Sequence, residues 1–81
     1  MAKVKTQTAK QERDLEKTYP RAKFIEKLRR LADTLEAGET FRIQVGGERI
    51  VVPSHASVSI EHEREDGVEE IEFQIKWKLD S

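Results

Sequence analysis

Apolar residues recur at helical spacing in the stretch between residues 18 and 38. Spaced three or four residues apart, with two adjacent pairs, they would share one face of a helix: Phe24, Ile25, Leu28, Leu31, Ala32 and Leu35. Thr18 is a candidate helix cap, and Pro20 suits a first turn. Gly38 supplies the left-handed residue on which many helices end. The pattern predicts one amphipathic helix, with its charged residues on the opposite face.

After the helix, apolar and polar residues alternate on both sides of Gly46-Gly47. This is typical of two strands joined by a two-residue turn. Such a turn would form these cross-strand pairs: Phe41 with Val52, Ile43 with Ile50, and Val45 with Glu48. The apolar members then lie on one face, so the sequence predicts a hairpin with a single apolar side.

A second hairpin is predicted around Asp66-Gly67, another pair favoured in two-residue turns. The expected cross-strand pairs are His62 with Ile71, Ile60 with Phe73, Val58 with Ile75, and Ala56 with Trp77. A slip of one residue would move one strand's apolar residues to the other face. The apolar pattern therefore tests the register by itself.

The connection Pro53-Ser54-His55 between the hairpins is short, which favours a continuous antiparallel meander covered on one face by the helix. Residues 1–17 are polar and ambiguous, and a possible edge strand is the interpretation that best fits their charge. The expected fold is α+β: one amphipathic helix on an antiparallel sheet of four to five strands, in the order β-α-β-β-β-β. The domain would span residues 18–81.

The stretch Ile71–Trp77 alternates apolar with polar residues and finishes on tryptophan. It resembles the amphi-Trp domain, a small prokaryotic family named for that feature. The helix is similar too, with leucines and a Leu-Ala pair between Leu28 and Leu35 and then Gly38. The resemblance implies a strand, a helix and further strands, with a first strand near residues 5 to 16. It implies no established activity.

Composition narrows the classes of function. The 81 residues suffice for one core. The chain has no cysteine, which removes disulfides and thiolate metal sites and favours a reducing compartment. Lys and Arg total 15 against 16 Asp and Glu, so the net charge of −1 opposes nonspecific attraction to nucleic acid or membranes. No apolar run reaches the roughly 20 residues of a membrane span, and the first residues lack the apolar stretch of a signal peptide. We expect a cytoplasmic protein without a cofactor.

Trp77 and Leu79, at the end of the last strand, form the first candidate interaction site. The parity of Trp77 predicts core packing opposite Ala56, with part of the ring free at the end of the sheet. A second copy of the chain could cover that part.

The polar face of the second hairpin is the second candidate, because Glu61 would lie opposite Glu72 and Glu63 opposite Glu70. Like charges that face each other weaken a sheet slightly. A solvated face is the main interpretation, and Lys3, Lys5 and Lys10 are candidate neighbours. A divalent cation or a basic protein segment are the alternatives.

Basic residues on the helix, including Arg29 and Arg30, could meet phosphates. Acidic neighbours dilute this patch, and no nucleic-acid-binding motif accompanies it. His55 and His62 lack a recognised metal-ligand spacing, and no spacing assembles a catalytic site. The sequence therefore predicts a non-catalytic protein-interaction or self-associating structural module. A nucleic-acid-binding module that uses the basic helix face is the alternative.

Overall fold

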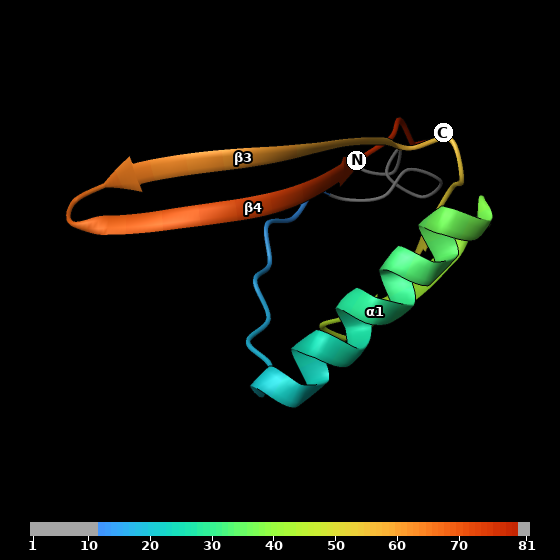
Figure 1. Ribbon diagram of the computed structural model, residues 1–81, viewed down its shortest axis with the longest axis horizontal. Coiled ribbons are helices and arrows are strands. Elements are labelled where there is room, and N and C mark those ends of the chain that lie inside the picture. Colours follow the sequence, from blue (N-terminus) through green and yellow to red (C-terminus); the bar gives the residue numbers. More distant parts are fainter. Residues whose placement is uncertain (1–11, 80–81) are drawn as a thin grey trace, which may run out of the picture.

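The computed structural model describes residues 12–79. The element order is helix α1 (Arg21–Ala37) followed by strands β1 (Phe41–Val45), β2 (Glu48–Val52), β3 (Ser57–Glu65) and β4 (Val68–Lys76). Figure 1 shows α1 lying obliquely to the long β3–β4 hairpin, whose tip projects away from the rest of the chain. The α+β class predicted from the sequence is confirmed.

Helix α1 begins at Arg21, two residues later than a cap at Thr18 would place it. Pro20 is the N-cap residue, and the backbone N–H of Phe24 donates to its carbonyl at 3.0 Å. The helix ends at Gly38, whose φ of 69° is left-handed as predicted. There the N–H of Gly38 donates to the carbonyl of Leu35 and the N–H of Glu39 to that of Thr34, both at 3.1 Å. These two bonds form a Schellman motif, which satisfies carbonyls at the helix end.

Both hairpins have the predicted register. Phe41 pairs with Val52 in the first, and Ile60 pairs with Phe73 in the second. Each turn contains two residues with positive φ: 55° and 82° at Gly46-Gly47, and 54° and 77° at Asp66-Gly67. Such turns match the right-handed twist of the strands that they join. Turn chemistry thus fixes the phase of each apolar row.

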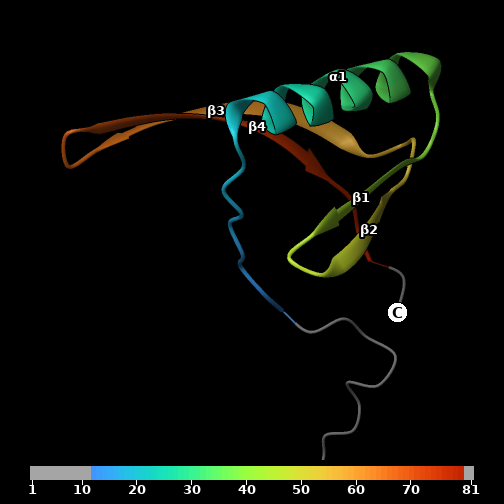
Figure 2. The same cartoon turned by 90° about the horizontal axis from the view of Figure 1, so that it is seen from below.

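The predicted four-stranded meander is wrong. β1 pairs only with β2 and β3 only with β4, so the described residues form two separate two-stranded sheets. The chain turns at Pro53–Ala56, where the N–H of Ala56 donates to the carbonyl of Pro53 at 3.1 Å. Because proline has no N–H, Pro53 cannot extend the hydrogen-bonded ladder of β2. Figure 2 shows β3 leaving the first hairpin here and running away from it.

Residues 12–20 are irregular, and Arg13 and Leu15 among them contact the turn of the first hairpin. The guanidinium of Arg13 donates to the carbonyl of Val45 at 2.9 Å and forms an ion pair with Glu48 at 3.0 Å. The side chain of Leu15 occupies the space that a Cβ at Gly46 would need. The edge strand expected in residues 1–17 is therefore not formed by residues 12–17, and its remainder lies outside the described residues.

The core of the described residues is very small. Phe41 and Val52, which face each other across the first hairpin, are its buried hydrophobic side chains, with exposures of 4% and 6%. From the helix, Arg30 places its guanidinium 4.6 Å from the centre of the Phe41 ring and donates to the carbonyl of Arg42 at 2.9 Å. No Cα atom of α1 lies within 8 Å of one in β3 or β4. The backbone of the helix therefore lies closer to β1 than to either strand of the second hairpin.

We predict that Phe41→Ala lowers the free energy of unfolding by about 3–5 kcal/mol, as expected when a buried phenylalanine is truncated. Urea denaturation followed by the fluorescence of Trp77 would measure this. Val51→Ala is the control, because Val51 is exposed on the same hairpin and its truncation should change stability by less than about 0.5 kcal/mol. Equal effects of the two substitutions would contradict this description of the core.

Candidate functional site

The apolar face of the β3–β4 hairpin is the most unusual surface of this molecule. Its central side chains are Val58, Ile60, Ile71 and Phe73, with exposures of 62%, 63%, 64% and 68%. They form one row because cross-strand pairing sets Ile60 beside Phe73 and alternation puts their neighbours on the same side. Single exposed apolar residues are ordinary on protein surfaces, whereas a contiguous exposed row of this kind is uncommon.

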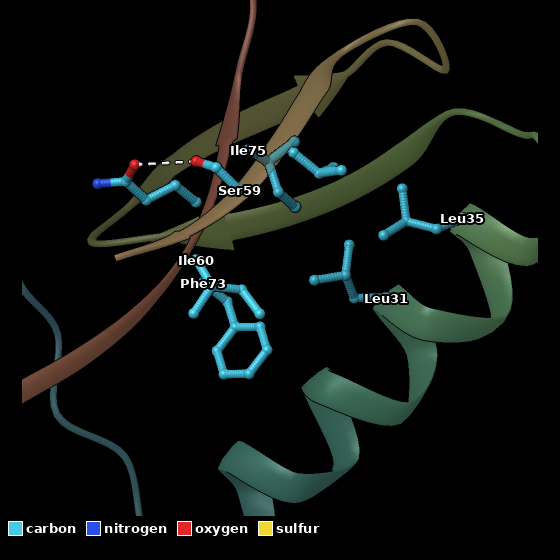
Figure 3. A pocket seen from close by; sticks show the side chains of 8 residues that line it. Leu31, Leu35, Ser59, Ile60, Phe73 and Ile75 are labelled. Carbon is cyan, nitrogen blue, oxygen red and sulfur yellow. Dashed lines mark hydrogen bonds between the residues drawn. The ribbon is translucent and has the colours of Figure 1, made fainter. Parts of the chain in front are cut away.

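Helix α1 turns its own apolar side toward this face across an open groove. Leu31 and Leu35 extend from the helix toward the side chains of Ile60, Phe73 and Ile75 (Figure 3). This part of the groove has a volume of about 420 Å³. An adjoining part of about 600 Å³ lies between the beginning of the helix and β4, and it is lined by Phe24, Leu28, Leu31, Ile71, Glu72, Phe73 and Gln74.

The opposite face of the hairpin is acidic, as predicted. Glu61 pairs with Glu72 and Glu63 with Glu70. The amide of Gln74 donates to Glu61 at 2.6 Å and to Glu72 at 3.2 Å, which offsets part of the repulsion. Toward the tip, the charges of Glu72 and then Glu63 raise the pKa of Glu70 above its ordinary value. Ionised Glu70 is thus repelled by its acidic neighbours, and protonation of Glu70 removes this repulsion.

Charged residues also end the apolar row at the hairpin tip. The carboxylate of Glu69 lies 2.7 Å from the ring Nε2 of His62 and 2.8 Å from the guanidinium of Arg64. The hydrogen bond from His62, followed by that from Arg64, lowers the pKa of Glu69. Because the folded-state pKa is depressed, the stabilisation is present above the ordinary glutamate pKa and is lost as the pH falls through the folded-state value. Glu69, His62 and Arg64 thus form a polar border at the tip end of the groove.

The Trp77 side chain is half-buried, just after β4 ends at Lys76. The paired ladder ends with Ser57 and Lys76, so the expected partnership with Ala56 lies one step beyond it. Leu79 is exposed. The end of the hairpin therefore offers apolar surface that continues the row of the hairpin.

Most basic residues of the helix already make contacts within the chain. Arg30 lies over the Phe41 ring and donates to the carbonyl of Arg42, as described above. The ammonium of Lys27 lies 4.9 Å from the centre of the Tyr19 ring, and that of Lys23 lies 3.8 Å from Glu26. Arg29 is exposed. The helix thus presents dispersed cations in place of a continuous basic stripe.

The two histidines lie at opposite ends of β3. His55 is in the turn before the strand, whereas His62 is near the tip beside Glu69. Within residues 12–79, no group of three or more histidine and acidic side chains is placed to hold a metal ion. In the same range, no helix is long and apolar enough to cross a membrane.

The sequence predicted each wall of the groove but not the groove. Parity identified the apolar row of the hairpin, and helical spacing identified the row on α1. Because the helix was expected to cover both hairpins, no open groove between the helix and the second hairpin was predicted. No periodicity in the sequence signals the groove, because it depends on the direction that the chain takes at Pro53–Ala56 between the two hairpins.

The chain belongs to the Amphi-Trp domain family, whose family model matches residues 5–81. The resemblance carried by the last strand and the helix is thereby confirmed. Searches among curated proteins and among solved structures found no match. The family membership describes the chain's ancestry and leaves its activity to be argued from the surface.

We predict that Trp77→Ala lowers the free energy of unfolding by about 1–3 kcal/mol, less than a fully buried aromatic side chain would give, because the ring is half-buried. Urea denaturation followed by circular dichroism would measure it, since the substitution removes the only tryptophan. A change near zero would place the ring in solvent, and a loss of about 4 kcal/mol or more would place it in a closed core.

For the acidic face, Glu70→Lys should raise the melting temperature, because it replaces a repulsive neighbour of Glu63 and Glu72 with an attractive one. The gain should shrink when salt is added. Glu16 is exposed in the irregular segment before α1, so Glu16→Lys changes the net charge equally without altering a helix end and is the matched control. An unchanged or lower melting temperature for Glu70→Lys alone would contradict the account of this face.

Proposed function

We propose that this protein is a non-catalytic protein-interaction module and that it binds through the apolar groove between α1 and the β3–β4 hairpin. One observation carries the proposal: the central side chains of the hairpin's apolar face are each more than three-fifths exposed. Exposed apolar surface of this extent is costly in water, and its burial by a partner is the main source of free energy in protein association.

The shape and lining of the groove favour a protein partner. Most of the side chains that line both walls are aliphatic or aromatic, and charged residues gather at the tip and on the outer face. Protein interfaces have this anatomy, with an apolar centre inside a polar rim. Phe73 and Phe24 supply the large side chains that commonly contribute most to binding.

The alternative, a nucleic-acid-binding module on the basic helix face, receives less support. Lys23, Lys27 and Arg30 make contacts within the chain, and the long hairpin presents glutamates to the solvent. Phosphates would be repelled by that face. A cytoplasmic setting is part of the proposal and is supported by the cysteine-free composition.

Two matched substitutions on β4 test the proposal. Ile71 and Val68 are 64% and 65% exposed, but Ile71 lies on the apolar face and Val68 on the acidic face. We predict that Ile71→Lys changes the mass measured by sedimentation, the binding of a hydrophobic dye, or both, because it puts a charge into the binding surface. Val68→Lys should change neither.

The proposal fails if Ile71→Lys and Val68→Lys match the unmodified chain in both mass and dye binding. Circular dichroism of the three proteins controls for unfolding. Since both side chains are almost equally exposed in the single chain, a difference between them cannot come from burial within that chain.

A further inference from the structure

We infer that the occupant of the groove is a second copy of this chain, placed so that α1 of each copy covers the apolar face of the β3–β4 hairpin of the other. The inference rests on the proposed function and names the partner. It follows from three properties of the described residues: the two-faced hairpin, the area of the apolar surface and the distribution of charge.

The two faces of the hairpin restrict what can fill the groove. A second hairpin inserted between the walls would bring its apolar face to one wall and its Glu61, Glu63, Glu70 and Glu72 side to the other. Buried, unpaired carboxylates would then oppose binding. If instead two grooves face each other about a two-fold axis, each helix meets the partner's hairpin. All four apolar walls then enclose one core, and both acidic faces remain in solvent.

The helix also has the right surface for this role. Phe24, Leu28 and Leu35 are exposed on α1 although they line the groove, and no Cα of α1 comes within 8 Å of the hairpin in its own chain. Helix α1 therefore keeps apolar side chains exposed where it faces the second hairpin. An isologous interface needs two complementary patches on one chain, and this chain carries both.

The area agrees with a stable dimer. A fully exposed residue of this size presents about 150–200 Å². With the observed exposures, Val58, Ile60, Ile71 and Phe73 together with Phe24, Leu28 and Leu35 then offer roughly 700 Å² per copy. A standard interface buries about 800 Å² per partner. The exposed apolar surface of the groove is thus close to what one interface of standard size requires.

The charge of the chain permits this approach. The net charge of −1 gives two copies almost no long-range repulsion. Within each hairpin, the guanidinium of Arg64 forms an ion pair with Glu69 at the edge of the apolar row, and His62 is hydrogen-bonded to the same carboxylate, so the border of the interface is not strongly negative. The glutamate pairs lie on the outer faces, where they discourage further stacking of hairpins.

Because the chain has no cysteine, an introduced cysteine is the only thiol that a cross-linker can modify. Leu31 of the helix and Ile60 of the hairpin line the same part of the groove. We would prepare Leu31→Cys and Ile60→Cys as separate proteins, mix them, and treat the mixture with a short bis-maleimide. Mass spectrometry would then identify which chains are joined. Val68→Cys on the acidic face, mixed with Leu31→Cys, is the matched control.

The expected result is a mass of two chains by light scattering, with links that join predominantly Leu31→Cys to Ile60→Cys and no link to Val68→Cys. Links that join mainly two Ile60→Cys chains would overturn the inferred arrangement, because the hairpins would then face each other. A mass of one chain at every concentration would overturn the second copy as occupant. In either case a difference between Ile71→Lys and Val68→Lys would leave the proposed function standing, and no difference would remove both.

Discussion

Alternation of residues along β3 and β4 gives the second hairpin two faces that need different surroundings. One face is a row of aliphatic and aromatic side chains, and the other presents paired glutamates. A two-stranded ribbon is only marginally stable in water unless something packs on its apolar side. Because α1 is engaged with Phe41 and the first hairpin, this requirement is not met within the described residues of one chain. The groove, the charge border and the inferred partner all follow from this constraint.

In the first hairpin, by contrast, the apolar side is packed against other parts of the chain. There Phe41 and Val52 are buried, and Arg30 of the helix lies over the Phe41 ring and donates a hydrogen bond to the carbonyl of Arg42. The N-terminal segment adds Arg13 and Leu15 at the turn. One helix of this length thus covers one short hairpin, and the longer hairpin is left with its apolar row exposed.

Local chemistry was predictable from the sequence, whereas the arrangement of the elements was not. Gly38 and the two positive-φ turns fix the helix end and both registers, because these depend on a few adjacent residues. The meander failed because pairing of β2 with β3 depends on the direction taken after Pro53, which no periodicity encodes. Trp77 is half-buried, which agrees with the prediction that part of its ring lies free at the end of the sheet. The groove could not be predicted while a single helix was assigned to cover four strands.

Dilution of the unmodified protein tests the central claim most directly. Light scattering over a wide range of concentrations would report its mass, and the emission of the sole tryptophan, Trp77, would report its surroundings in the same samples. Covering of the hairpin by a second copy predicts the mass of two chains at high concentration and one chain on dilution, with a parallel change in emission. A mass of one chain at all concentrations, with constant emission, would contradict it.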